Sequence, residues 1–196
     1  MRPPHGRHPK AAFALLRPIV YSSVQRHPMI HVCSLAALPQ TVRLTGASHV
    51  LTIMANVEQV QRPESIRPEN HLRVSVDDIT EQLPGFMAPS DDHVAQVLAF
   101  VRGWDRTAPL VIHCYAGISR STASAFAAAC ALNPQRDELD IAWAIRHASP
   151  IASPNRLIVS LADRALGRQG RMVRALDAIG PGAMMVDSQP FRIELE

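Results

Sequence analysis

The feature that most constrains this 196-residue chain is a short apolar run that leads into a polar loop and then into an alanine-rich segment. The apolar run, residues 109–112, ends at His113 and Cys114. Arg120 follows after five residues, and the alanine-rich segment 123–132 comes soon after it. This order predicts a strand, a tight loop and a helix, with a cysteine where the loop begins and an arginine where it ends.

A loop of this length suits phosphate binding. Five residues can curl so that successive backbone N–H groups converge, and the following helix adds its own N-terminal N–H groups and the positive end of its dipole. Gly117 permits a backbone angle that other residues resist. The planar guanidinium of Arg120 can hold two phosphate oxygens at once. This field favours the thiolate form of Cys114, which can then attack a bound phosphorus atom.

The two polar neighbours of these residues fit supporting roles. The hydroxyl of Ser121 is expected to donate to the cysteine sulfur when that sulfur becomes a leaving group. Side chains alternate along a strand, so His113 should point away from Cys114. We therefore expect His113 to brace the loop through hydrogen bonds rather than to act as a base.

The motif has the form His-Cys-x-x-Gly-x-x-Arg-Ser, and it resembles the signature of the cysteine-dependent protein tyrosine phosphatases. Residues 116–121 look most like the dual-specificity branch and its small bacterial relatives. The resemblance covers residues 30–166 and implies a phosphomonoesterase that forms a cysteinyl-phosphate intermediate without a metal or cofactor. The residues that it implies for phosphate binding are Cys114, Tyr115, Ala116, Gly117, Ile118, Ser119 and Arg120.

Such a reaction needs an acid, because the leaving oxygen of a phosphate ester requires a proton. In the resembling family an Asp that follows a strand, a few tens of residues before the cysteine, supplies it. Asp77 and Asp78 lie 37 and 36 residues before Cys114. If Val74 and Val76 face the core, Asp78 continues that inward phase and Asp77 points the other way. Asp78 is therefore the predicted acid, Asp77 is the alternative, and a third possibility is that both simply cap the loop.

Three further residues have two interpretations each. Asn155 stands in a Pro-Asn step similar to one in the family, where the Asn helps to hold the phosphate loop, but an ordinary helix N-cap explains it as well. Cys33 and Cys130 are either resolving thiols for an oxidised Cys114 or buried core residues.

Charge and cysteine content exclude several classes of protein. The net charge is +3, but the first 28 residues contain five basic residues and no acidic ones, so the basic character belongs to this segment and not to a nucleic-acid-binding face. No apolar run approaches the roughly 20 residues of a membrane span. Three widely spaced cysteines argue against a disulfide framework, and no cluster has zinc spacing. A reactive thiolate needs a reducing compartment, so we expect a cytoplasmic protein.

The domain organisation follows from the pattern of apolar segments. We expect a disordered extension at 1–28, a single phosphatase-like domain at 29–180 and a C-terminal tail at 181–196. Strands alternate with helices, which predicts an α/β fold: a mostly parallel sheet of about four to five strands flanked by helices, with a helical C-terminal half. Asn133 and Pro134 suit the start of a helix that runs to about residue 148. Ligands of such sheets bind beyond the carboxyl ends of the strands, where Cys114 and Asp78 lie.

The composition of the loop narrows the substrate. Phosphoinositide phosphatases of this superfamily tend to carry lysines in the loop, whereas positions 115, 116, 118 and 119 are Tyr, Ala, Ile and Ser. We therefore expect a phosphorylated protein or peptide. Dephosphorylation of phosphotyrosine alone and dual specificity both stay open, as do the physiological substrate and the oligomeric state. A rhodanese-like sulfurtransferase and a non-catalytic phosphopeptide-binding module are the alternative functions.

Overall fold

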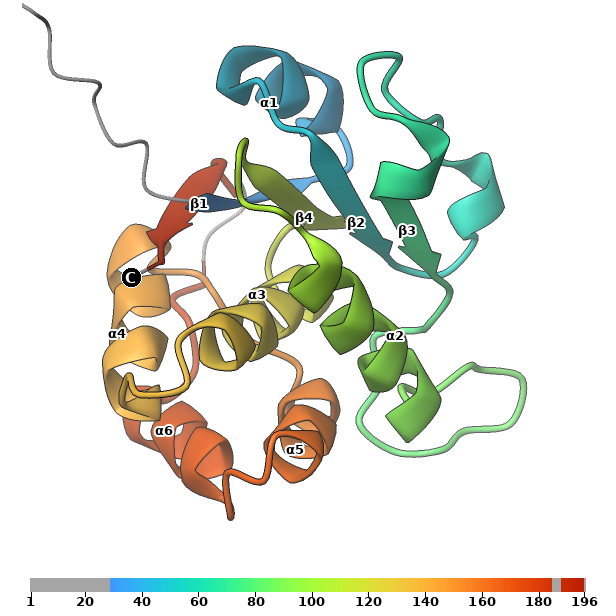
Figure 1. Ribbon diagram of the computed structural model, residues 1–196. Coiled ribbons are helices and arrows are strands. Elements are labelled where there is room, and N and C mark those ends of the chain that lie inside the picture. The colour runs from blue at the N-terminus through green and yellow to red at the C-terminus, as the bar shows by residue number, and fades with distance from the viewer. Residues whose placement is uncertain (1–28, 185–187, 196) are drawn as a thin grey trace, which may run out of the picture.

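A five-stranded sheet forms the centre of the fold, with the strand order β3-β2-β4-β1-β5 (Figure 1). The computed structural model describes residues 29–184 and 188–195, and the expected N-terminal extension, 1–28, lies outside them. The strands are β1 (Met29–Ser34), β2 (His49–Ile53), β3 (His71–Val74), β4 (Leu110–Cys114) and β5 (Phe191–Glu194). The first four pair in parallel, and β5 pairs antiparallel to β1.

Helices cover both faces of the sheet, which explains why every residue of the central strand β4 is buried (Figure 1). One face packs against α1 (Leu38–Thr45) and the short 3-10 turn Val57–Gln59. A second 3-10 turn, Pro68–Asn70, has no buried residue and leads directly into β3. The other face packs against the remaining helices. These are α2 (Asp91–Gly103), α3 (Arg120–Leu132), α4 (Glu138–Ala148), α5 (Arg156–Ala165) and α6 (Arg171–Ile179).

The alanine-rich helix α3 is the centre of the helical layer. Every residue of α3 except Ala131 is buried, and it contacts α2, α4 and α5 as well as β4. The small side chains of the segment let the neighbouring helices approach closely. This packing holds the N-terminal end of α3 close in space to the end of β4, with residues 115–119 between them in the sequence.

The helix that follows α3 begins later than the sequence indicates. The prediction that Asn133 and Pro134 open this helix is wrong, because α4 begins at Glu138 and its cap is Asp137, whose carboxylate accepts the N–H of Leu139 at 2.7 Å. Asn133 instead ends α3, and its side-chain amide donates to the carbonyl of Ala129 at 2.9 Å. An Asn is compatible with either end of a helix, so the residue type alone does not decide.

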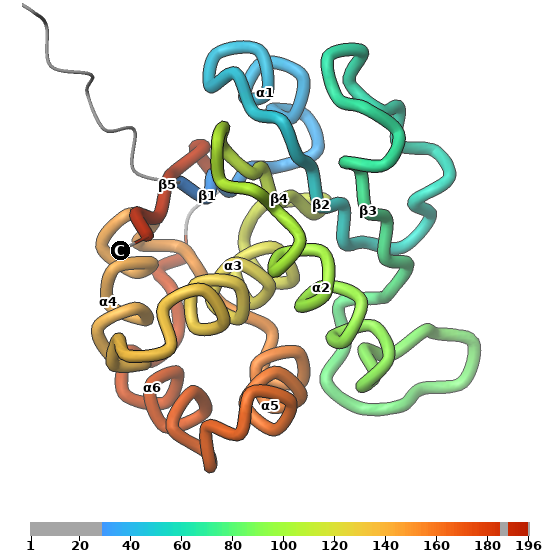
Figure 2. Tube along the Cα trace, viewed as in Figure 1, coloured from blue at the N-terminus to red at the C-terminus, as the bar shows by residue number. Residues whose placement is uncertain are grey.

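The last strand of the sheet comes from the segment expected to be a tail. The side chains of Phe191 and Ile193 are buried, and β5 adds an edge to β1 and contacts α4. The trace in Figure 2 shows β5 running beside β1 near α4. None of the helices in the described ranges is long and apolar enough to cross a membrane.

Candidate active site

Cys114 is the last residue of β4, and its side chain lies at the base of the loop that leads to α3. The residue is 1 % exposed. Its Sγ accepts the backbone N–H of Gly117 at 3.2 Å and lies 3.1 Å from the hydroxyl oxygen of Ser121. Both groups can donate a hydrogen bond to a sulfur anion. The structure therefore places Ser121 where the sequence predicted it, against the cysteine sulfur.

Residues 115–119, here called the cysteine loop, pack tightly against the end of β1. Gly117 has a φ of 76°, and a Cβ on it would lie 2.7 Å from the backbone carbonyl carbon of Cys33. Both the left-handed angle and the close approach require glycine at this position.

The carbonyl groups of the cysteine loop are bonded to the surrounding protein. Four accept hydrogen bonds from outside the loop: Tyr115 from the N–H of Leu35 (3.1 Å), Ala116 from the hydroxyl of Ser188, Ile118 from the N–H of Ser153 (2.9 Å) and Ser119 from the N–H of Asn155 (3.3 Å). A planar trans peptide directs its C=O and N–H in opposite directions, so an outward carbonyl turns the next N–H inward. The N–H of Gly117, which donates to Cys114, follows this rule.

The amides of the loop complete this pattern. The N–H groups of four loop residues have no hydrogen-bond partner within 29–184 and 188–195: Tyr115, Ala116, Ile118 and Ser119. A loop in which most carbonyls are bonded outward and most amides are unbonded is suited to binding the oxygens of an anion.

Arg120 is the first residue of α3, and its side chain crosses toward the strand β3. The residue is 9 % exposed, and its Nη1 donates to the carbonyl of Val76 at 2.9 Å. Its Nε has no hydrogen-bond partner within the described part of the chain and lies 3.7 Å from Oδ2 of Asp78. The guanidinium and the N-terminal end of α3 therefore place positive charge beside the cysteine loop.

Asp78 faces the cysteine loop, whereas Asp77 faces away from it. Oδ1 of Asp78 accepts the hydroxyl of Ser119 at 2.7 Å, and the side chain is 37 % exposed. The carboxylate of Asp77 instead accepts the N–H of Met87 at 2.8 Å, and the N–H of Asp77 donates to the carbonyl of Met87 at 2.8 Å. Asp78 is thus brought to Arg120, and Asp77 closes the loop 77–87 on itself.

Asn155 connects Asp78 to the start of α5. Its Oδ1 accepts the N–H of Ile158 at 3.1 Å, which makes it the N-cap of α5. Its Nδ2 donates to Asp78 Oδ1 at 2.9 Å and to the carbonyl of Ile79 at 3.2 Å. The helix-cap interpretation and the loop-support interpretation of this residue describe two contacts of the same side chain.

Comparison with known proteins finds similarity in structure but not in sequence. No protein-family model and no curated protein matches the chain. The solved structure of DUSP15 superimposes with a TM-score of 0.55 at 20% identity, over 78% of this chain and 94% of that one. The fold is that of the dual-specificity phosphatases. This finding confirms the predicted central sheet, its flanking helices and the helical C-terminal half.

Two further structures show the same likeness. The human tyrosine phosphatase-like serine/threonine/tyrosine-interacting protein gives a TM-score of 0.56 at 16% identity, over 71% of this chain and 92% of that one. The Yvh1 phosphatase domain from Chaetomium thermophilum gives 0.52 at 19% identity, over 73% and 93%. The described residues therefore span nearly the whole of such a phosphatase fold.

Within this phosphatase fold, His113 belongs to a buried chain of polar groups. Its Nε2 lies 2.7 Å from Oγ1 of Thr52, and the same oxygen lies 2.8 Å from Nε2 of His71. Its Nδ1 lies 3.4 Å from the carbonyl oxygen of Cys114. Burial lowers the pKa of His113 to about 4. The pKa of His71 is also lowered to about 4, first by burial and then by the charge of Arg73.

Thr52 and His71 could not be placed behind the cysteine loop from the sequence alone. For Thr52 a weak signal was present, because this threonine lies between the apolar residues Leu51 and Ile53 of a buried strand. His71 is the first residue of a strand with a second polar residue, so it gave no such signal. In the sheet Thr52 lies directly beside His113, in the register of β2 and β4. That register depends on the strand order, which a local pattern does not supply.

The other two cysteines are core residues that are not placed to pair with Cys114. Cys33 lies beside His113 in the register of β1 and β4, so it shares the face of the sheet opposite to Cys114 and packs toward α1. Cys130 lies ten residues along α3 from Arg120, a distance of about 15 Å. Burial raises the pKa of each to about 12.

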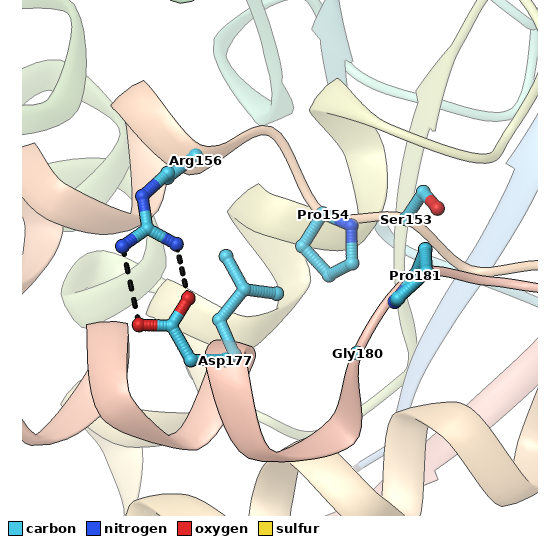
Figure 3. Close-up of a pocket in the computed structure, with 7 residues that line it drawn as sticks. Ser153, Pro154, Arg156, Asp177, Gly180 and Pro181 are labelled. Carbon is cyan, nitrogen blue, oxygen red and sulfur yellow. Dashed lines mark hydrogen bonds and ion pairs between the residues drawn. The ribbon is translucent and has the colours of Figure 1, made fainter.

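A pocket of about 310 Å³ lies behind the segment that anchors the cysteine loop (Figure 3). Figure 3 shows Arg156 of α5 and Asp177 of α6 joined by an ion pair at its wall, with Ser153 and Pro154 on the other side. Cys114, Arg120 and Asp78 do not line it, so it is separate from the candidate active site. Within the described ranges, no group of three His, Cys, Asp or Glu side chains could hold a metal ion.

Proposed function

We propose that this protein is a phosphomonoesterase that acts as a protein tyrosine or dual-specificity phosphatase through a cysteinyl-phosphate intermediate. One observation supports the proposal above all others. The sulfur of Cys114, the guanidinium of Arg120 and the carboxylate of Asp78 surround one loop in which four of the five carbonyls are bonded outward, the Gly117 amide donates to the sulfur and the other four amides are unbonded within the described residues. The fold shared with dual-specificity and tyrosine phosphatases supports it independently.

Substrate binding uses the loop and the arginine. The inward N–H groups of residues 115–120 hold the phosphoryl oxygens, and Arg120 adds two N–H donors from its guanidinium. The carbonyl of Val76 already holds one end of that guanidinium, so its orientation is set before the substrate arrives. The bound phosphorus then lies over the sulfur of Cys114.

The reaction takes place in two steps. The Cys114 thiolate forms an S–P bond as the P–O bond to the leaving group breaks, and Asp78 gives its proton to the leaving oxygen. Asp78 then takes a proton from water, the water oxygen bonds to phosphorus, and the S–P bond breaks. The hydroxyl of Ser121, 3.1 Å from the sulfur, stabilises the thiolate that leaves. His113 holds the start of the loop.

A phosphorylated protein or peptide is the substrate class that we propose. The cysteine loop offers no lysine that would match a highly charged inositol phosphate. Because the mechanism requires a thiol that stays reduced, a reducing compartment such as the cytoplasm suits it. Turnover of phosphotyrosyl and phosphoseryl peptides would separate strict tyrosine specificity from dual specificity.

The test is turnover of p-nitrophenyl phosphate in the presence of EDTA by four proteins: the wild type, Cys114→Ser, Asp78→Asn and the matched control Asp77→Asn. We expect metal-independent turnover that Cys114→Ser abolishes. Asp78→Asn should lower kcat by at least about a hundredfold, the usual size of an acid–base effect. Asp77→Asn should lower it less, because Asp77 bonds within its own loop.

Other results would redirect the assignment. Turnover that survives Cys114→Ser would contradict the mechanism. If Asp77→Asn is the more damaging change, Asp77 is the acid and the nucleophile stands. Turnover of thiosulfate without phosphatase activity would identify a sulfurtransferase. Tight phosphopeptide binding by the wild type without turnover would identify a binding module.

A further inference from the structure

A threonine hydroxyl lies between two buried histidines behind the cysteine loop. Thr52 Oγ1 is 2.7 Å from Nε2 of His113 and 2.8 Å from Nε2 of His71. Thr52 and His113 are 0 % exposed, and His71 is 8 % exposed. The lowered pKa of each imidazole keeps both rings neutral near pH 7. The three groups come from the adjacent strands β3, β2 and β4.

The positions of the protons on Thr52, His71 and His113 can be deduced from their hydrogen bonds. Thr52 Oγ1 carries one hydrogen, and within the described part of the chain the two histidine nitrogens are the acceptors in reach of it, so Thr52 donates to one histidine and accepts from the other. A neutral imidazole carries one N–H, so each choice also fixes what its Nδ1 does. Two arrangements are therefore possible, and they differ in the direction of every hydrogen bond.

One arrangement is unfavourable at both ends. If Thr52 donates to His71, the proton of His71 lies on Nδ1, a buried atom with no hydrogen-bond partner in the described part of the chain. His113 would then carry its proton on Nε2, and its bare Nδ1 would face the carbonyl oxygen of Cys114, two acceptors at 3.4 Å. A buried N–H without an acceptor is rare and costly.

The other arrangement leaves no buried N–H without an acceptor and does not bring two acceptors together at Cys114. Thr52 donates to Nε2 of His113, and the Nδ1–H of His113 donates to the carbonyl of Cys114. Nε2–H of His71 donates to Thr52, and the orphan Nδ1 of His71 is then an acceptor. The charged or titratable groups that act on His71 are Arg73, His113 and Arg62, and each disfavours a second proton on its ring.

The Cys114 carbonyl has the same function as the outward carbonyls of the loop. Its peptide unit contains the N–H of Tyr115, which points away from His113 because the unit is planar and trans. A fixed Cys114 carbonyl thus turns the first amide of the loop inward. We propose that Thr52 and His71 are positioning residues that fix the tautomer of His113, so that His113 holds the Cys114 carbonyl and the cysteine loop keeps its amides toward the thiolate. The proposal rests on the proposed function for its catalytic meaning.

The first experiment reads the tautomers directly. ¹⁵N NMR of histidine-labelled wild type at pH 7 should show His113 protonated on Nδ1 and His71 protonated on Nε2, with assignments from His113→Asn and His71→Gln. The reverse tautomers would overturn the proposal. This result does not depend on phosphatase activity or on the folding of a Thr52 variant.

The second experiment reads the thiolate. The absorbance of the thiolate near 240 nm is measured against pH, and the absorbance of Cys114→Ser is subtracted as the blank. The midpoint of this titration is compared between the wild type, Thr52→Val, which loses the hydroxyl, and Thr52→Ser, which keeps it. We expect Thr52→Val to move the midpoint upward by roughly half to one pH unit, the size of one hydrogen bond, and Thr52→Ser to restore it. A folded Thr52→Val with an unchanged midpoint would contradict the proposal.

The two proposals fail separately. If the wild type has the expected tautomers and Thr52→Val shows the expected thiolate shift, but the wild type does not turn over p-nitrophenyl phosphate, the phosphatase function is rejected and the positioning role stands. An active wild type with the reverse tautomers would do the opposite.

Discussion

The side-chain amide of Asn155 lies 2.9 Å from the carboxylate of Asp78, which it meets from 77 residues away in the sequence. The same side chain caps α5 through its oxygen. One residue therefore links the start of a helix to the position of the proposed acid, and substitutions can separate its two contacts.

Asn155→Ser and Asn155→Ala should differ in stability but not in activity. Ser keeps a cap oxygen and adds no charge beside Asp78, so the free energy of unfolding should stay close to that of the wild type, whereas Ala should lower it by about 1 kcal/mol. Both remove the donor to Asp78, and we expect kcat to fall about tenfold in each, the equivalent of one hydrogen bond. Urea unfolding and p-nitrophenyl phosphate turnover measure the two effects. A fully active Asn155→Ala would show that the Asp78 contact is not needed.

Gly117→Ala should disrupt the cysteine loop. Gly117 has a positive φ, and an added Cβ would meet the backbone of Cys33 at 2.7 Å. We expect a loss of at least about 2 kcal/mol in the free energy of unfolding, together with loss of activity.

Gly85→Ala is the matched control for this change. Gly85 has a φ of 80°, but an added Cβ would meet nothing within 4 Å. It should cost about 1 kcal/mol for the backbone angle alone. Equal losses in the two variants, measured by urea unfolding, would mean that the contact with Cys33 adds nothing.

The sequence was sufficient for features that depend on local spacing. The His-Cys step, Gly117 and Arg120 are close together in the chain, so the strand, loop and helix that they form could be predicted from their order. The choice of Asp78 over Asp77 as the residue that faces the loop followed from strand alternation, and the contacts of the two carboxylates agree with it.

Features that depend on distant pairing could not be predicted in the same way. The contacts of Thr52 with His71 and His113 require β2 to lie between β3 and β4. The pairing of β5 with β1 joins the two ends of the described chain. The prediction that Asn133 opens the helix after α3 was wrong for another reason, since an Asn before a Pro fits either the end of one helix or the start of the next.

A buried ion network should contribute strongly to stability. Glu138 accepts from Arg168 at 2.8 Å and from Arg171 at 3.0 Å, and the side chains of Glu138 and Arg168 are 4 % and 9 % exposed. Glu138→Gln leaves the charge of Arg168 buried without its partner. We expect the free energy of unfolding to fall by about 3 kcal/mol.

The exposed pair of Arg164 and Asp91, 2.7 Å apart, provides the comparison for this network. Asp91→Asn should change the free energy of unfolding by less than about 1 kcal/mol, because solvent screens the pair. Urea denaturation of both variants at pH 7 tests the difference. A Glu138→Gln protein as stable as Asp91→Asn would show that the network is not needed for the fold.

The two buried histidines should make the protein less stable in mild acid. The pKa of His113 and that of His71 are about 4 in the folded protein, below the ordinary value of 6.5. Between these values the unfolded chain takes up protons that the folded chain does not, so the stabilisation is complete above pH 6.5 and is lost as the pH falls through about 4.

Within that range the free energy of unfolding should fall by about 1.4 kcal/mol per pH unit for each histidine. His71→Gln removes one of the two groups and should flatten the slope by one proton. Urea unfolding at intervals from pH 7 to pH 4.5 measures both slopes. If the free energy of unfolding of the wild type stays constant over this range, or if His71→Gln leaves the slope unchanged, then the imidazole of His71 is not held neutral by the fold.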